Sequence, residues 1–289
     1  MTLDQLRIFL AVAEREHVTR AAEALHLTPS ATSAAISALE QRHGVRLFDR
    51  IGRRIVLSDA GRSFRTEARK LLAQAEQAER MLEDLAGLTR GHLRIAASQT
   101  VANYWLPPVL ARYRQSYPGI ELQLRIGNSE EAAQKVHELE ADLAVIEDRC
   151  HDDLLEVHPL ASDHMKLVRA AGLASLPFDP ATQSWVLREP GSGTRAIFDH
   201  WLAAQGLAAG DLPPVLELPS NEAVRAAVEA GAGASILSEL VVAHSLESGR
   251  LSVLEATLPQ RPFSLLRHRE RPFTRAEAAF LALAKAAGG

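Results

Sequence analysis

"VTRAAEALHLTPSATSAAISALE" (residues 18–40) is the stretch that decides the fold of the N-terminal part of the chain. Thr19 stands before one run of helix-forming residues, and Thr28 stands before Pro29 and a second run. Threonine is a favoured helix cap, and proline is favoured at the first position of a helix. Because residues 26–28 leave room only for a tight turn, we predict two short helices in a helix-turn-helix.

The second of these helices has an unusually thin apolar face, made by Ala35, Ile36 and Leu39. Small and hydroxyl side chains cover the rest of it, so it could enter a major groove and place hydroxyls against bases or phosphates. The alternative is a helix of small residues packed between two neighbours. A further helix is expected to begin at about Leu3, because Thr2 and Gln5 form a capping box.

A cluster of arginines follows this helix in "RLFDRIGRRIVLS", residues 46–58. We predict strands at Arg46–Phe48 and Arg54–Leu57 with a turn at Ile51-Gly52, which makes a basic wing. Arginines on a wing can neutralise backbone phosphates at the edge of a groove, although such a cluster could also be a solvated charged face. The predicted DNA contacts are Thr28, Ser30, Ala31, Ser33, Ala34, Ser37, Arg50, Arg53 and Arg54.

The distribution of charge supports a basic front part, although the net charge of the chain is −4. Residues 1–94 contain 15 Lys and Arg against 12 Asp and Glu, whereas residues 95–289 contain 17 against 24. The one cysteine, Cys150, excludes an internal disulfide. Asp4 and Arg7 interrupt the first turns and no long apolar run follows, so we expect a cytoplasmic protein without a membrane role.

A long helix is predicted from Asp59 to Leu88, since no proline interrupts it. Its apolar positions are spaced alternately by four and three residues, which is the pattern of a coiled-coil seam. The alternative is one amphipathic helix lying on its own core. We predict dimerisation through a seam that includes Phe64, Leu71, Ala75, Ala78 and Leu82.

From Gly91 onward, strand-like and helix-like segments alternate, which is typical of an α/β domain with parallel strands. Two loops follow strands and begin helices, at residues 98–100 and 189–195, and both are rich in hydroxyl groups and free N–H groups. Facing each other, they could hold a small anion with little help from formal charge. The alternative is plain helix capping, and Arg195 could pair with Asp199. The predicted effector contacts are Ser98, Gln99, Thr100, Glu147, Ser192, Gly193, Thr194 and Asn221.

Catalysis and cofactors are not expected. No lysine follows the glycine loop as in a nucleotide phosphate loop, and we find no nucleophile with an adjacent base. His151, His158 and His164 have no recognised metal-ligand spacing. Cys150 is better explained as a structural thiol than as a redox sensor. The alternative function is an enzyme or small-molecule-binding module that carries a basic N-terminal arm.

The whole chain resembles the LysR-type transcriptional regulators. The resemblance rests on the helix with Phe9, the Ala21-Ala22 pair, the run from Ser33 to Glu40, and the wing from Gly44 to Arg50. The chain departs from the family pattern at Pro29, where glutamine is usual, and at Thr32, where an aliphatic residue is usual. The loops at 98–100 and 188–195 resemble those of the branch that senses small anions, including regulators of sulfur assimilation and carbon fixation.

The resemblance implies a multidomain protein. A winged helix-turn-helix would occupy residues 1–58, a linker helix 59–89, and a two-lobed effector domain like the periplasmic binding proteins 90–289. Lobe I would span about 90–161 and 267–289, and lobe II about 162–266. The implied function is transcription regulation, in which a small anion modulates binding to double-stranded promoter DNA. The implied partners are further copies of the chain, as a homodimer or homotetramer, and RNA polymerase.

Overall fold

The structure is a computed structural model that describes residues 1–51, 54–85, 90–147 and 150–288. The chain divides into two compact units, Met1–Leu82 and Glu83–Gly289, and each is described by itself. Among the described residues, no helix combines the length and the apolar character that crossing a membrane requires.

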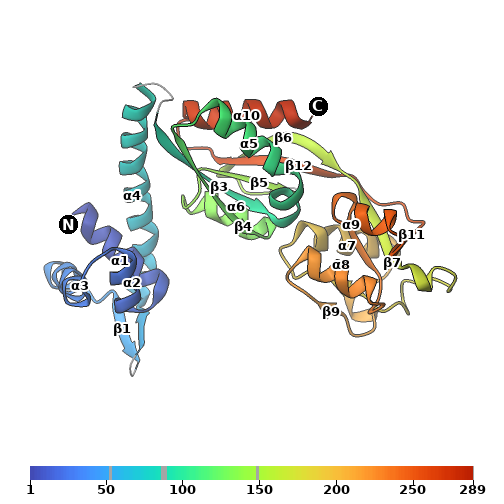
Figure 1. The fold of residues 1–289 in the computed structure, drawn as a ribbon. Helices are drawn as coiled ribbons and strands as arrows, with labels where there is room; N and C mark the ends of the chain where they lie inside the picture. Colours follow the sequence, from blue (N-terminus) through green and yellow to red (C-terminus); the bar gives the residue numbers. More distant parts are fainter. Residues whose placement is uncertain (52–53, 86–89, 148–149, 289) are drawn as a thin grey trace. The chain divides into compact units, whose positions relative to one another are not determined.

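The first unit begins with a bundle of short helices whose starts follow from capping (Figure 1). The helices are α1 (Leu3–Arg15), α2 (Val18–Ala24) and α3 (Pro29–His43). The capping box of Thr2 and Gln5 is confirmed, and Thr28 caps α3 with Pro29 as its first residue. The start of α2 was predicted wrongly, because His17 rather than Thr19 is its cap and accepts a hydrogen bond from the Arg20 N–H.

An aromatic core holds this unit together. The ring of Phe9 is fully buried and lies 5.4 Å from the ring of Phe48 and 4.9 Å from that of Phe64, measured between centroids. Ile36 and Leu39 of α3 join the same core, so the exposed face of α3 is fixed by the residues on its opposite face.

The wing is a hairpin of β1 (Phe48–Ile51) and β2 (Arg54–Leu57), in which Phe48 pairs with Leu57. The first strand therefore begins at Phe48, and the prediction that it spans Arg46–Phe48 was wrong. The reason is that Glu40 binds the backbone where the strand begins. Its carboxylate accepts hydrogen bonds from the N–H groups of Leu47 and Phe48, at 2.7 and 3.2 Å. Gly52 of the predicted turn lies outside the described residues.

The long helix α4 (Asp59–Leu85) confirms the predicted uninterrupted segment as far as Leu85, and residues 86–88 of that prediction lie outside the described residues. The predicted seam has two parts. Phe64 and Ala68 pack into the core of the first unit. Leu71 and Leu82, further along, are 41% and 69% exposed. The beginning of the helix therefore lies on the chain's own core, whereas Leu71 and Leu82 are exposed and the seam between two copies stays a prediction.

Lobe I of the second unit is built on a five-stranded sheet of order β4-β3-β5-β12-β6. Strands β3, β4 and β5 are parallel, as predicted, and β12 runs antiparallel to both of its neighbours. Its elements are β3 (Gly91–Ser98), η1 (Val101–Trp105), α5 (Leu106–Ser116), β4 (Ile120–Gly127), α6 (Ser129–His137), β5 (Leu143–Glu147), β6 (Leu155–Asp163), β12 (Arg261–His268) and α10 (Arg275–Gly288).

Residues 101–116 are helical throughout but of two types, with a π-helical turn, η1, before α5. Pro107 and Pro108 give the reason, since proline lacks an N–H and is tolerated only in the first turn of an α-helix. The change of helix type directly follows one of the predicted effector loops, and single π turns are frequent at functional sites.

Lobe II differs from the expected parallel arrangement. Its main sheet, of order β10-β7-β11, is antiparallel, whereas the short β8 and β9 pair in parallel and Trp185 forms a parallel bridge with Ala234. Its elements are β7 (Met165–Ala170), η2 (Ala171–Leu173), β8 (Val186–Leu187), α7 (Gly193–Ala204), η3 (Ala209–Asp211), β9 (Leu216–Glu217), α8 (Asn221–Glu229), β10 (Ser235–Ser238), α9 (Glu239–Glu247) and β11 (Leu251–Leu254).

Two strands connect the lobes: β6 leads from lobe I to lobe II, and β12 returns (Figure 1). They pair along their length from Arg261↔Asp163 to His268↔Leu155. Strand β12 belongs to the sheet of lobe I from Arg261 onward, earlier than the boundary expected near residue 266. The crossing point therefore places Arg261 and Asp163 between the lobes.

We predict that Glu40→Ala loosens the wing without unfolding the helices. Two backbone N–H groups would lose their acceptor, which costs about 1–3 kcal/mol for each group left unsatisfied. Hydrogen exchange of the full chain should accelerate at least about tenfold in residues 46–51. The matched control is Glu40→Gln, which keeps an acceptor oxygen and should leave exchange nearly unchanged. Equal acceleration in both variants would contradict this role of Glu40.

Candidate functional site

The outer face of α3 is exposed and consists of small and hydroxyl side chains. The exposed members of the predicted DNA contacts are Thr28, Ser30, Ala31, Ser33, Ala34 and Ser37. The buried face is Thr32, Ile36 and Leu39. The hydroxyl of Thr32 donates to the Thr28 carbonyl oxygen at 3.1 Å, which explains how a polar residue is tolerated at a buried position.

The basic wing is described in part. Arg50 lies on β1 and is exposed, as a phosphate contact requires. Arg53 lies outside the described residues, and so does the side chain of Arg54. The predicted DNA contacts whose side chains the structure describes are therefore all exposed on the surface of the first unit.

Glu147 is the centre of a second cluster, in the second unit. It is the last residue of β5 and is only 1% exposed. The hydroxyl of Ser98, at the end of β3, donates to one of its carboxylate oxygens. The hydroxyl of Thr100 donates to the other at 2.9 Å. Since β3 and β5 are parallel neighbours, their carboxyl ends meet at one edge of the sheet, which brings these residues together.

Arg261 joins this cluster from the crossing strand β12. Its guanidinium is 1% exposed, lies 3.5 Å from a Glu147 oxygen, and donates to the Thr194 hydroxyl at 3.0 Å. It also donates through Nε to Asp163 at 3.1 Å. Sequence reasoning missed both Arg261 and Asp163. The available signal was a charged residue at the edge of an otherwise apolar strand, which indicates a buried ion pair only once its partner is known.

Asn221 completes the connection to lobe II. Its side-chain amide donates to the Thr100 hydroxyl at 3.0 Å, and its carbonyl oxygen accepts from Arg188 at 2.6 Å. Its backbone N–H donates to Gln99 at 3.1 Å, and Gln99 in turn donates to the Pro219 carbonyl at 2.9 Å. Lobe I and lobe II are therefore joined by direct hydrogen bonds through residues that the sequence singled out. We call the group of Ser98, Thr100, Glu147, Thr194, Asn221 and Arg261 the interlobe seat.

The glycine loop lies against this seat at the start of α7. A side-chain carbon added to Gly193 would lie 1.8 Å from the Glu147 carbonyl oxygen, so only glycine allows this approach. Ser192 is buried and its side chain does not cap the helix. Arg195 pairs with Asp199 at 2.9 Å, which is the alternative considered for it from sequence.

Arg188 forms an ion pair with its neighbour in the chain, Glu189. It donates to both carboxylate oxygens of Glu189, at 2.8 and 2.7 Å. Burial by itself would raise the pKa of Glu189, but the hydrogen bonds from Arg188 and Asn128 bring that pKa below its usual value. The guanidinium of Arg188 is therefore held as half of an ion pair while it contacts Asn221.

A second set of hydrogen bonds joins the two lobes beside the interlobe seat. The Tyr104 hydroxyl of lobe I donates to Glu222 of lobe II at 3.1 Å, and the Asn103 amide donates to the same oxygen at 3.3 Å. Burial and the neighbouring Glu222 carboxylate raise the pKa of Tyr104 to about 12. The phenol therefore stays protonated, and remains a donor, throughout the neutral pH range.

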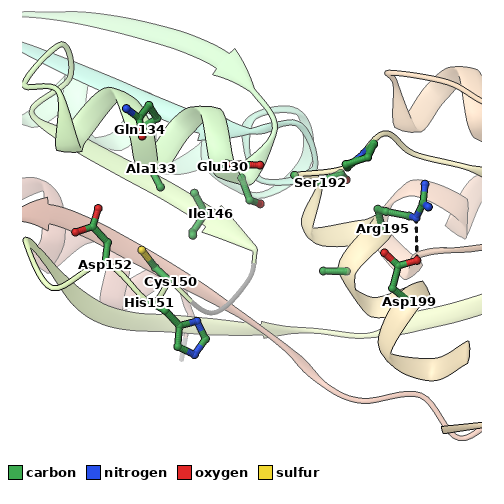
Figure 2. Close-up of a pocket in the computed structure, with 14 residues that line it drawn as sticks. Glu130, Ala133, Gln134, Ile146, Cys150, His151, Asp152, Ser192, Arg195 and Asp199 are labelled. Carbon is green, nitrogen blue, oxygen red and sulfur yellow. Dashed lines mark hydrogen bonds and ion pairs between the residues drawn. The ribbon is translucent and has the colours of Figure 1, made fainter. Parts of the chain in front are cut away.

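A pocket of about 540 Å³ lies between α6 and α7, next to the glycine loop (Figure 2). In Figure 2, Glu130, Ala133 and Gln134 form one wall and Ser192, Arg195 and Asp199 the other. Cys150 and His151 also line the pocket. Within the described ranges, no three His, Cys, Asp or Glu side chains are grouped so that they could hold a metal ion.

Two family models match the chain. The model described as "Bacterial regulatory helix-turn-helix protein, lysR family" matches residues 3–62, and the model described as "LysR substrate binding domain" matches residues 86–289. The second match contains every residue of the interlobe seat.

Curated relatives match over nearly the whole chain. An uncharacterized HTH-type transcriptional regulator, YeiE of Escherichia coli, is 37% identical and covers 97% of this chain and 96% of its own length. A RuBisCO operon transcriptional regulator of Allochromatium vinosum is 35% identical over 88% of this chain and 85% of its own length.

Solved structures show the same fold. Full-length CbnR in complex with its target DNA has a TM-score of 0.68 at 22% identity, and the match covers 99% of this chain and 100% of CbnR. LysG of Corynebacterium glutamicum with bound effector Arg has a TM-score of 0.60 at 22% identity, covering 100% of this chain and 98% of LysG.

We predict that Gly193→Ala destabilises the second unit. The new methyl group would overlap the Glu147 carbonyl, and overpacking of this kind costs about 1–3 kcal/mol or more. Calorimetry of the full chain should show a lower melting temperature for the transition of that unit. The matched control is Gly210→Ala, where the added carbon has nothing within 4 Å. Equal melting of the two variants would mean that the loop does not need its close approach.

Proposed function

The chain belongs to the LysR family of bacterial transcriptional regulators, and on that premise we propose that a small anion between its lobes adjusts its binding to promoter DNA. Membership means that the N-terminal unit binds DNA and that the C-terminal domain binds an effector. The expectation that the chain is a regulator and not an enzyme is confirmed by its relatives.

The observation that carries the anion proposal is the set of donors in the interlobe seat. Two hydroxyls and a guanidinium surround the carboxylate of Glu147, at the carboxyl ends of two parallel strands. Groups that stabilise one carboxylate in the absence of solvent have the polarity and spacing to stabilise an oxyanion. An effector anion would share or take over these donors.

The lobes provide the step from binding to regulation. Asn221, Gln99 and Tyr104 connect them by hydrogen bonds that depend on how far the lobes are closed. An anion that changes these bonds favours one lobe arrangement over another. It can shift that equilibrium only by its difference in affinity for the two arrangements, typically about 1–3 kcal/mol.

For DNA, we propose that the exposed face of α3 enters the major groove and that the wing contacts phosphates. The predicted contacts are those given above, including Arg53 and Arg54. The proposed seam between two copies lies on α4 and consists of Leu71, Ala75, Ala78 and Leu82. Two copies joined there would present two DNA-binding domains to a two-fold symmetric DNA site. A homodimer or homotetramer that contacts RNA polymerase at the promoter completes the proposal.

The effector proposal is tested by the melting temperature of the full chain in the presence of small oxyanions and carboxylates. An anion at a hundred times its dissociation constant should stabilise the second unit by about 2.7 kcal/mol. The same anion should have much less effect on Thr100→Val, which removes one hydroxyl donor while keeping the side-chain shape. If no small anion raises the melting temperature of the wild-type chain, the anion proposal is wrong.

The DNA proposal predicts distinct effects for two kinds of contact. Arg50→Ala should weaken binding to all sequences and reduce the slope of log affinity against log salt by about 0.9 for each bound copy of the chain, the effect of one lost phosphate contact per copy. Ser33→Ala should instead reduce the preference for the native promoter sequence. Arg7→Ala is the control, since Arg7 lies on α1 and pairs with Asp4. Salt-dependent mobility-shift assays measure all three, and an unchanged slope for Arg50→Ala would contradict the wing contact.

A further inference from the structure

We propose that Glu147 makes the interlobe seat selective for oxyanions that still carry a proton, such as hydrogen phosphate or hydrogen carbonate, over fully deprotonated ones, such as sulfate or nitrate. This inference rests on the proposed function, because it names the class of anion that the same seat would take. The argument has three parts: hydrogen-bonding capacity, charge, and the position of the neighbouring cations.

The seat consists of hydrogen-bond donors with one exception. Ser98 and Thr100 offer hydroxyls, Asn221 an amide and Arg261 a guanidinium. The carboxylate of Glu147 accepts from two of these donors and lies 3.5 Å from the Arg261 guanidinium, and a carboxylate can only accept. Any ligand oxygen that comes within hydrogen-bonding distance of Glu147 must therefore bring its own hydrogen.

The remaining capacity of Glu147 is sufficient for such a bond. A carboxylate has about four acceptor sites, and the hydroxyls of Ser98 and Thr100 occupy one on each oxygen. A ligand hydroxyl could add a bond at a free site, or replace one of the two hydroxyls, which would then turn to the ligand's other oxygens. In both cases the O–H of the ligand donates to Glu147 and its unprotonated oxygens accept from the donors.

The negative charge of Glu147 is incompletely balanced. Arg261 gives its close, doubly bonded contact to Asp163, whose carboxylate faces it on the paired strand, and lies 3.5 Å from Glu147. Arg188 is bound through two nitrogens to Glu189. A deprotonated oxyanion placed beside Glu147 would therefore meet a like charge without a hydrogen between them, which is strongly unfavourable in a buried site.

A cationic ligand is less well suited to the seat. Glu147 could accept from an ammonium or guanidinium group, but Arg261 and Arg188 already reach the same set of residues. A third cation would stand next to two buried guanidinium groups. The geometry thus favours a ligand that is anionic overall and carries one donor.

The test compares probes of matched shape that differ in carrying a proton. Phosphate and sulfate are both tetrahedral, and hydrogen carbonate and nitrate are both planar. Calorimetric titration of the full-length chain at neutral pH should show that one proton-bearing member binds at least about tenfold more tightly than its partner, since an unmatched buried polar contact costs on the order of a factor of ten to a hundred in affinity.

The variant Glu147→Gln should remove most or all of this preference. Its amide can donate to a ligand oxygen and carries no charge, so sulfate or nitrate should bind at least about tenfold more tightly than to the wild type, while the proton-bearing partner gains less or weakens. The matched control is Glu130→Gln, an identical change at a carboxylate that lines the neighbouring pocket on α6. It should leave the preference unchanged.

Each outcome has a definite meaning. If the wild type binds the deprotonated member of its preferred pair equally well, the selectivity proposal is wrong while the anion effector stands. If it binds none of the four probes, the selectivity proposal is wrong, and the anion effector is then decided by the wider melting screen. If arginine binds and Glu147→Gln abolishes that binding, Glu147 recognises a cation and the proposal is again overturned. Should Glu147→Gln fail to fold, the wild-type comparison alone decides.

Discussion

The contact between Arg261 and Asp163 is the constraint on which the arrangement of the two lobes depends. Both side chains are almost completely buried, and a buried charge is tolerated only when it is paired and hydrogen-bonded. Because the two residues are also register partners on β6 and β12, the strands that connect the lobes carry the ion pair themselves. The same guanidinium reaches Thr194 and Glu147, so the interlobe connection and the candidate effector site share one side chain.

This sharing has a consequence for regulation. The polar groups of the seat are bonded to one another across the lobes, through Asn221, Thr100 and Glu147. A ligand at this candidate site would have to replace hydrogen bonds within the protein by its own, so its net effect on stability would be the difference between two similar free energies. Such a balance is what a switch requires, since a modest change in binding can then alter which lobe arrangement is favoured.

The first unit is held together differently, by an apolar core that fixes the exposed face of α3. Phe9 contacts rings from both β1 and α4, so the wing and the long helix are fixed to the same small core. Glu40 then sets where the wing begins by holding the backbone of Leu47 and Phe48. The exposed hydroxyl face of α3 is the result of burying Ile36 and Leu39 on its other side.

The sequence by itself determined the features that depend on neighbouring residues: the capping box of Thr2 and Gln5, the start of α3 at Thr28 and Pro29, and the alternation of strands and helices after Gly91. It also singled out Ser98, Thr100, Glu147 and Asn221, because polar residues at the ends of strands and starts of helices are recognisable locally. Only the tertiary structure decided that Arg261 and Asp163 join them, that the main sheet of lobe II is antiparallel, and that Glu40 shortens the wing. Those outcomes arise from pairing between distant segments, for which short-range periodicity and capping carry no signal.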